Sequence, residues 1–274
     1  MKYMLLTAAA LVVVFGLSFL IAGLIRRKMK TKIALGWHIL ISIGAGCLVL
    51  AGAAAVYVNI HYAAQEDALA VLHETGDVTV TEENGGYFID GKGDSAALVF
   101  YPGAKVDAEA YLPLLRQLAE NGTDCFLARP PLRMALLDSN AAQRFIDAHD
   151  YAHWLVSGHS MGGVAAASFA AAHADEVDGV VLLAAYPNSA LSDDTFLLSV
   201  YGTNDKVLNR AAYDDAEKNR PSDATEVILD GGNHAFFGNY GAQSGDGEAA
   251  ITREEQQKQT VNAILEAEHA HGIS

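Results

Sequence analysis

Short, uninterrupted apolar segments alternate with segments of helical spacing along the last two-thirds of the chain. The apolar segments cover residues 96–101, 123–130, 153–158, 179–186, 196–202 and 224–231. Helical spacing marks residues 107–122, 139–149, 162–176, 209–220 and 252–270. A strand that is apolar at every position must be covered on both faces, as happens when helices connect parallel strands. We therefore predict an α/β fold with a doubly wound, mostly parallel sheet.

Two long segments without Asp, Glu, Lys or Arg precede this part, at residues 3–25 and 33–60. A helix of 23 residues is about 34 Å long, enough to cross a hydrocarbon core of about 30 Å. The basic stretch RRKMKTK, residues 26–32, lies between the two segments. A cleaved signal peptide is the alternative for residues 3–25, but a basic loop and a second long apolar segment follow directly. We predict two transmembrane helices that form a membrane hairpin.

The basic stretch also predicts an orientation. Short loops rich in Lys and Arg stay on the cytoplasmic side of a membrane. Residues 26–32 would therefore be cytoplasmic, with both termini and the globular part outside. The expected division is a hairpin at 1–63, a linker helix and first strand at 64–85, and the α/β domain at 86–274. Within residues 64–85 and just beyond, the alternating stretch VTVTEENGGYFID with its Asn-Gly turn predicts a β-hairpin.

Charge separates the two parts of the chain. Six of the 18 basic residues precede residue 66, whereas all 33 acidic residues lie at or after it, which leaves a net charge of −21 for the globular part. Such a surface argues against nucleic acid as a partner and against docking on anionic lipid. The two cysteines, Cys47 and Cys125, have no zinc-site spacing. We expect no metal and no cofactor.

The segment WLVSGHSMGG carries the clearest chemical signal. Ser160 has glycines two positions away on either side, after an apolar strand and before an Ala-rich helix. Gly158 and Gly162 allow a tight turn that holds the serine hydroxyl at the carboxyl end of the sheet, where open α/β folds bind ligands. The start of the following helix offers the backbone N–H of Met161 to an oxyanion. Ser160 is therefore the candidate nucleophile.

The order of strand, Gly-His-Ser-Met-Gly-Gly, helix, a later acid and a final histidine resembles the α/β-hydrolase superfamily. The likeness covers about residues 86–270 and is greatest to the small, lidless branch that includes dienelactone hydrolases and simple carboxylesterases. It implies that Asp205, in YGTNDKV, is the acid of a catalytic triad. It implies that His234, in DGGNHAFF, is the base. Asp193 and Asp194 compete as the acid, and either Asp205 or His234 could instead be an ordinary loop residue.

The resemblance also implies a second oxyanion donor after the strand at 96–101. The loop YPGAKVD places the Ala104 N–H at that position, with Pro102 where the family more often has His. Four further residues are expected to bind substrate: Lys105 at the pocket mouth, His159 beside the nucleophile, and Phe236 and Phe237 as a wall. The short link at 187–195 leaves no room for a lid, which favours small or extended acyl substrates.

Several functions fit these patterns. The leading prediction is a membrane-anchored serine hydrolase that cleaves a small-molecule carboxylic ester or a related acyl bond. An acyltransferase would use the same triad. A catalytically silent binding or scaffold domain is disfavoured because Ser160, Asp205 and His234 are all present. A transport role for the hairpin has little support, since His38 is the only ionisable residue of the two apolar segments besides weakly acidic Tyr and Cys.

Overall fold

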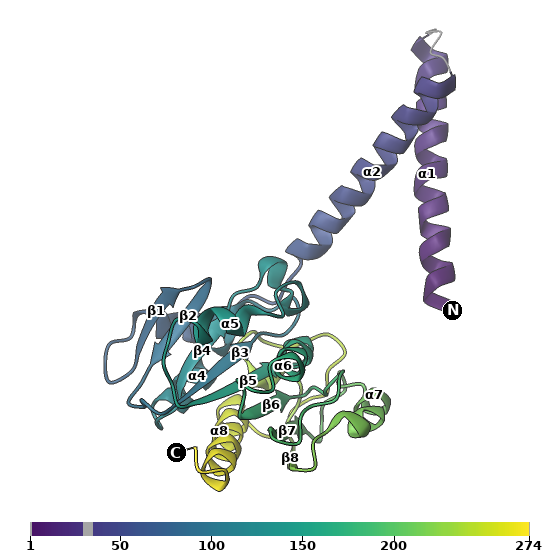
Figure 1. The fold of residues 1–274 in the computed structure, drawn as a ribbon. Coiled ribbons are helices and arrows are strands. Elements are labelled where there is room, and N and C mark those ends of the chain that lie inside the picture. The colour runs from purple at the N-terminus through teal and green to yellow at the C-terminus, as the bar shows by residue number, and fades with distance from the viewer. Residues whose placement is uncertain (1, 30–34, 274) are drawn as a thin grey trace. The chain divides into compact units, whose positions relative to one another are not determined.

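A computed structural model describes residues 2–29 and 35–273 of the chain (Figure 1). The chain divides into two compact units, Met1–Ile60 and His61–Ser274. Each unit is described by itself below.

The first unit consists of two helices, α1 (Lys2–Met29) and α2 (Leu35–Asn59). The ring of Phe15 lies over Gly46, where an added Cβ would be 2.5 Å from ring atoms. The ring of Phe19 meets His38 edge-on, with a centroid distance of 4.5 Å. These contacts between aromatic rings and small or flat partners hold the two helices together.

Among the described residues, one helical segment, Leu35–Tyr57, is long and apolar enough to cross a membrane, with a mean hydropathy of 2.4. The other predicted span, residues 3–25, is not supported, so the two-helix membrane hairpin is not confirmed. Helix α1 continues through Arg26, Arg27 and Lys28, which form its last turn rather than a loop. Residues 30–32 of the predicted basic loop lie outside the described part of the chain.

The second unit is built on an eight-stranded sheet. Its strands are β1 (Thr79–Glu83), β2 (Gly86–Asp90), β3 (Ala96–Tyr101), β4 (Asp124–Ala128), β5 (His153–His159), β6 (Gly179–Leu183), β7 (Phe196–Gly202) and β8 (Ala224–Leu229). The order across the sheet is β1-β2-β4-β3-β5-β6-β7-β8. Strands β1 and β2 form the predicted antiparallel hairpin, β2 is antiparallel to β4, and every remaining neighbouring pair is parallel.

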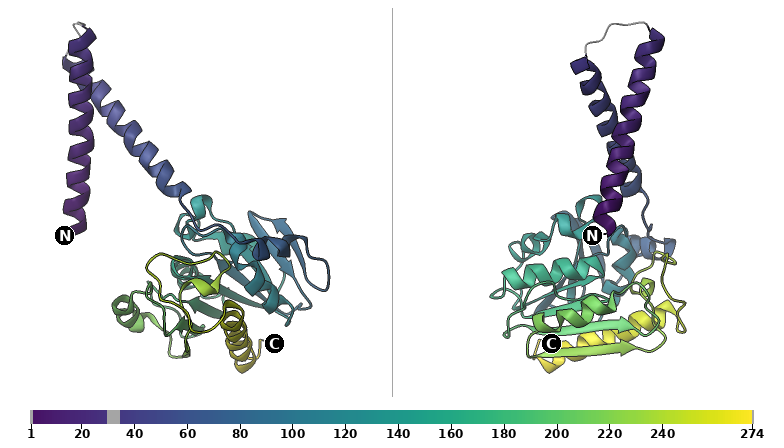
Figure 2. Two further views of the ribbon diagram at one scale, coloured as in Figure 1. Left: turned by 180° about the vertical axis from the view of Figure 1, so that it is seen from behind. Right: turned by 90° about the vertical axis from the view of Figure 1, so that its right-hand side faces the viewer.

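Helices cover both faces of this sheet (Figure 2). They are α3 (Glu66–Ala70), α4 (Leu112–Ala119), α5 (Ala141–Ile146), α6 (Met161–Ala172), α7 (Arg210–Asp215) and α8 (Arg253–Ala270). Alternate side chains of the central strands pack against α4 and α8 on one face and against α5 and α6 on the other. Strands β3, β4, β5, β6 and β7 are buried at nearly every position, as their continuous apolar sequences predict.

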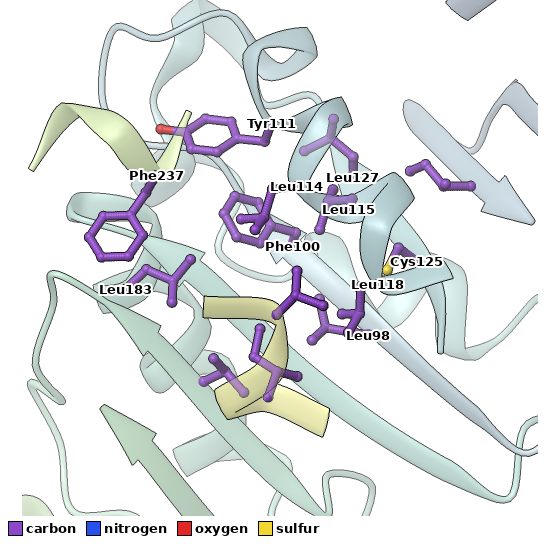
Figure 3. Packing of buried hydrophobic residues seen from close by; sticks show 14 of the residues in the cluster. Leu98, Phe100, Tyr111, Leu114, Leu115, Leu118, Cys125, Leu127, Leu183 and Phe237 are labelled. Carbon is purple, nitrogen blue, oxygen red and sulfur yellow. The ribbon is translucent and has the colours of Figure 1, made fainter. Parts of the chain in front are cut away.

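The core beneath α4 is the larger apolar cluster (Figure 3). Leu114, Leu115 and Leu118 of α4 contact the sheet between Leu98 and Leu127, and all five are at most 2% exposed. Tyr111 lies at the end of this cluster, with its hydroxyl oxygen directed away from the leucines. The apolar ring is therefore part of the core while its polar atom faces the carboxyl end of the sheet.

Three elements differ from expectation. Strand β8, expected to be buried, is largely exposed because it lies at the edge of the sheet with one neighbour. The predicted helix 107–122 begins as a 3-10 turn, Ala108–Tyr111, before α4. The linker helix predicted within 64–85 is α3 followed by a 3-10 turn, Val71–His73, and it packs on the domain with Ala68 fully buried.

Candidate active site

The three residues of the expected triad lie at the same edge of the sheet. Ser160 directly follows β5, Asp205 lies three residues after β7, and His234 lies five residues after β8. Strands β5, β6, β7 and β8 follow one another in the sheet and all run parallel, so their carboxyl ends point the same way. This is the edge at which open α/β folds bind ligands.

Ser160 occupies a backbone conformation that is rare for a residue with a side chain, with φ 54° and ψ −122°. Its N–H donates to the Leu183 carbonyl at 2.9 Å, which fixes the turn to β6. A Cβ on Gly158 would lie 2.4 Å from the Gly162 carbonyl carbon, and one on Gly162 would lie 2.2 Å from the Tyr101 oxygen. The glycines are therefore required, and the sheet and α6 sustain about 1–3 kcal/mol of local strain at Ser160.

His234 is held by Asp205. The Nδ1 atom of His234 lies 2.8 Å from Asp205 Oδ2, and the two side chains are 1% and 2% exposed. The other carboxylate oxygen accepts hydrogen bonds from the N–H groups of Val207 and Leu208, both at 2.8 Å. Burial opposes ionisation of Asp205, but these bonds and His234 outweigh it and keep the pKa of the carboxyl below its usual value.

The charge on Asp205 determines the tautomer of His234. An ionised carboxylate can only accept, so Nδ1 of His234 carries the hydrogen and Nε2 is left with its lone pair. Nε2 is buried and has no hydrogen-bond partner among the described residues. The atom available to accept a proton is therefore the one directed away from Asp205.

Ser160 and His234 line a common cavity of about 310 Å³, referred to below as the Ser160 cavity. Its remaining wall is mostly apolar, formed by Leu136, Val164, Ala184, Ala185, Val207 and Leu208, with Met161, Tyr186 and Asn209. This volume is at the small end of the range for ligand sites.

The four predicted substrate residues do not line the Ser160 cavity. Phe237 is fully buried in the core, because the turn after His234 directs it toward the sheet. Phe236 faces a separate cavity of about 680 Å³ formed by the loop before α8. The backbone of Lys105 is hydrogen-bonded on both sides: its N–H donates to the Arg133 carbonyl at 2.9 Å, and its carbonyl accepts from the Tyr62 N–H at 2.7 Å.

His159 is buried behind His234 rather than exposed in the cavity. It is 1% exposed, and its ring centroid lies 4.5 Å from that of His234. Its Nδ1 atom lies 2.8 Å from the Tyr111 hydroxyl, which also accepts from the Gly103 N–H at 3.1 Å. Burial, followed by the neighbouring His234, holds the pKa of His159 well below its usual value, so this ring is neutral.

The two expected oxyanion donors lie on adjoining elements. Met161 begins α6 and lines the Ser160 cavity. Ala104 follows Gly103 in the loop after β3, and Gly162 of α6 lies against the Tyr101 and Pro102 carbonyls of that loop. The loop and the helix start are thus in contact, while the roles of Met161 and Ala104 stay predictions.

Sequence reasoning missed two residues that hold this region. Tyr111 was an apolar position of a predicted helix, and nothing in the sequence indicated a partner for its hydroxyl. Asp246 lies in the long loop after His234; its Oδ2 accepts from the Ala235 N–H at 2.9 Å and its Oδ1 from the Lys206 N–H at 3.3 Å. Asp246 therefore joins the residue after the acid to the residue after the base.

The acid and metal alternatives can also be placed. Asp193 accepts a hydrogen bond from the Ser222 N–H at 2.8 Å and is not the partner of His234. The described residues contain no group of three or more His, Cys, Asp or Glu side chains that could hold a metal ion.

A search of curated proteins gave no match. Two solved structures are similar in fold. One is a serine hydrolase involved in carbazole degradation, the CarC enzyme, with a TM-score of 0.50 and 11% sequence identity over 69% of this chain and 99% of that chain. The other is a predicted CIB-like hydrolase from Thermoplasma acidophilum, with a TM-score of 0.51 and 17% sequence identity over 68% of this chain and 98% of that chain. A family model described as the alpha/beta hydrolase family matches residues 97–258, more than half of the sequence. The chain belongs to the alpha/beta hydrolase family.

Proposed function

We propose that this protein is a serine hydrolase that cleaves a carboxylic ester with Ser160 as nucleophile, His234 as general base and Asp205 as its orienting acid. One observation carries the proposal. His234 is fixed by a carboxylate on one nitrogen, and its other nitrogen is unpaired at a cavity that Ser160 also lines. Such an arrangement of nucleophile, base and orienting group activates a serine hydroxyl.

The reaction proceeds in two halves. Ser160 Oγ attacks the ester carbonyl carbon while its proton passes to His234 Nε2. The tetrahedral intermediate collapses, the alcohol leaves with the proton from Nε2, and an acyl–Ser160 ester remains. Water then attacks this ester, gives its proton to Nε2, and the acid is released as Ser160 regains its proton. Asp205 stays ionised throughout and stabilises the imidazolium.

Two backbone groups are proposed to stabilise the oxyanion. The N–H of Met161 is at the start of α6, where it is free of a helical partner and the helix dipole is positive. The N–H of Ala104 is the second donor, because its loop lies against Gly162. Donors of this kind act on the charge that develops in the transition state, so they raise kcat.

The cavity indicates the part of the substrate that is bound. Its small, mostly apolar volume fits the ester group and a short length of hydrocarbon on either side. An acyltransferase would use the same triad with an alcohol or amine in place of water. Product analysis with and without added acceptor distinguishes the two reactions.

We further propose that α2 anchors the protein in a membrane. Its segment Leu35–Tyr57 has the length and composition of a span. The basic residues 26–32 precede it in the sequence, which favours the cytoplasm for that end and the outside for the hydrolase domain.

Labelling with a fluorophosphonate probe tests the hydrolase proposal without knowledge of the substrate. The wild-type chain should be labelled, and Ser160→Ala should not. Ser168→Ala is the matched control, because Ser168 lies on the same helix with its hydroxyl bonded to the Val164 carbonyl. Labelling of the Ser160→Ala variant, or no labelling of the folded wild type, would overturn the proposal.

A further inference from the structure

The segment between β4 and α5 exposes an unusual number of leucines. Leu132, Leu136 and Leu137 are 56%, 47% and 60% exposed. In the described part of the second unit, only two other large apolar side chains are exposed, Leu69 and Ile228, at 41% and 50% on other elements. Single exposed leucines are ordinary, but three within six residues form a patch that suits an apolar partner.

The patch adjoins the Ser160 cavity through one of its three leucines. Leu136 lines the cavity together with Ser160 and His234. Leu132 lies on the other side of the loop after β3, in a cavity of about 370 Å³ that Pro102 also lines. An apolar partner bound to the leucines would therefore lie directly at the entrance to the candidate active site.

The chain enters the domain beside the same patch. Tyr62 pairs with Val106 in a parallel bridge, and its N–H donates to the Lys105 carbonyl at 2.7 Å. The Lys105 N–H in turn donates to the Arg133 carbonyl, next to Leu132, at 2.9 Å. Helix α2 ends at Asn59, so only Ile60 and His61 connect it to Tyr62. Three peptide steps reach at most about 11 Å.

Basic and acidic side chains balance around Leu132, although the net charge of the domain is strongly negative: Arg129, Arg133, Asp107 and Glu109 all line the same cavity. Arg129 and Arg133 line the cavity with Leu132, and their side chains are 52% and 35% exposed. Each pairs with a carboxylate, Arg129 with Glu82 and Arg133 with Asp107. A guanidinium has donors beyond one such pair and binds phosphate well. Leucines bordered by arginines match the interface of a zwitterionic phospholipid bilayer.

We propose that the surface formed by Leu132, Leu136, Leu137, Arg129 and Arg133 rests on the membrane that holds α2, and that the Ser160 cavity takes its ester from a lipid of that membrane. The docking rests on the proposed membrane anchor α2, and the substrate part rests on the proposed hydrolase function. The cavity holds the ester and a short stretch of chain, while the rest of the lipid stays in the bilayer. The short connection between Asn59 and Tyr62 limits how far the domain can move from that membrane.

Depth-dependent quenching tests the docking independently of catalysis. The full chain, with Cys47→Ala, carries a single fluorophore at Leu137→Cys and is reconstituted in phosphatidylcholine vesicles; Cys125 is buried. Ile228→Cys is the matched control site, because Ile228 is 50% exposed on the distant edge strand β8. Lipids with a quencher near the headgroup should quench the label at 137 and not the label at 228. Equal quenching at both sites, or none at 137, would overturn the docking.

Kinetics with two esters test the lipid substrate. The variant Leu132→Asn/Leu137→Gln should lose about tenfold or more in kcat/KM on p-nitrophenyl palmitate embedded in phosphatidylcholine vesicles, since two apolar side chains no longer enter the bilayer. It should keep wild-type activity on soluble p-nitrophenyl acetate. Asn suits position 132, where φ is 56°. The control pair Leu69→Gln/Ile228→Thr should change neither rate.

The outcomes separate the two proposals. Unchanged activity of the leucine variant on the vesicle ester would overturn the lipid substrate. A folded wild type that cleaves neither ester would overturn the hydrolase function, and the quenching result would still decide the docking.

Discussion

The hydroxyl oxygen of Tyr111 lies 2.8 Å from Nδ1 of His159, in a fully buried position behind His234. The same oxygen accepts a hydrogen bond from the Gly103 N–H, and when Nδ1 of the neutral His159 ring carries the lone pair, the Tyr111 hydroxyl donates to it. His159 is then neutral, with its hydrogen on Nε2, in agreement with its lowered pKa. Tyr111 thus connects the loop that contains Ala104 to His159, the last residue of β5 before Ser160.

Tyr111→Phe should weaken both stability and catalysis. The change leaves the Gly103 N–H and His159 Nδ1 without a buried partner, at a cost of about 1–3 kcal/mol. Because Ala104 follows Gly103, kcat on p-nitrophenyl acetate should fall more than KM rises. Urea unfolding and steady-state kinetics measure the two effects. Tyr87→Phe is the control: Tyr87 bonds Glu109 and Arg129, away from the cavity, and its loss should leave kcat unchanged.

Asp205→Asn should lower kcat on the same ester by about 10²–10⁴. An amide can present its N–H₂ to His234 and stabilise the wrong tautomer, with the hydrogen on Nε2. Asp193→Asn removes a carboxylate that caps Ser222 instead, and it should have little effect. If Asp193→Asn inactivated the enzyme and Asp205→Asn did not, the acid would be misassigned.

The double variant Ser160→Ala/His234→Ala should have a kcat scarcely lower than that of either single variant, because the residues act as a unit.

Gly162→Ala should destabilise the fold and abolish most activity. The new methyl would lie 2.2 Å from the Tyr101 oxygen and 2.4 Å from the Pro102 oxygen, both backbone atoms that cannot move aside alone. Overpacking of this kind costs about 1–3 kcal/mol. Chemical denaturation measures the loss of stability, and hydrolysis of p-nitrophenyl acetate measures the loss of activity. At Gly76 an added methyl meets nothing within 4 Å, so Gly76→Ala should be neutral, and a neutral Gly162→Ala would contradict the geometry.

Glu268 should make stability depend on pH. Burial, opposed by a hydrogen bond from Thr123, raises its pKa from 4.5 to about 7. A folded state that holds this proton more tightly is favoured below pH 4.5 and loses the advantage as pH rises toward 7. A shift of one pKa unit corresponds to about 1.4 kcal/mol, so the free energy of unfolding falls by about 3 kcal/mol over this pH range.

Glu268→Gln removes this titration while it keeps the shape of the side chain. The free energy of unfolding of the variant minus that of the wild type should be about 2–3 kcal/mol larger at pH 8 than at pH 5. Unfolding curves at the two pH values provide the measurement. Glu266→Gln, at an exposed position of the same helix, serves as the control and should show no such difference. Equal effects of Glu268→Gln at both pH values would mean that the carboxyl is ionised when buried.

Cysteine labelling tests the proposed orientation. In intact cells, Lys28→Cys should be shielded from an impermeant thiol reagent, because basic residues stay in the cytoplasm. Thr81→Cys, at an exposed position of β1 near Glu83, should react. Cys125 gives little background because it is buried. The reverse pattern would place the hydrolase domain in the cytoplasm.

The sequence predicted the parts of the fold in which each residue's surroundings follow from the local pattern. The continuous apolar runs at 96–101 and 196–202 match β3 and β7 because buried parallel strands need apolar residues on both faces. At 224–231 the same rule failed. The edge position of β8 exposes Ile228, and strand order is set by packing across the whole chain rather than by the strand itself.

The candidate site was predictable only where a residue's position along the chain determines its neighbours. Ser160, Asp205 and His234 each follow a strand closely, so parallel strands bring them to one edge. The local sequence did not show in which direction the side chains after the strand ends would point. Phe237 turns into the core and His159 turns beneath His234, whereas Leu136, from a segment that gave no functional signal, lines the cavity. Contacts of this kind depend on three-dimensional packing.

The edge position of β8 has a consequence for heat inactivation. His234 depends for its position on a strand that has hydrogen-bonded neighbours on one side only and is largely open to water. Edge strands with few buried contacts open at lower free energy than the core. Fraying of β8 would separate His234 from Ser160 while β3, β5 and β6 stayed intact. Turnover would then vanish at a temperature at which far-ultraviolet dichroism still reports a folded protein, and it would return on cooling.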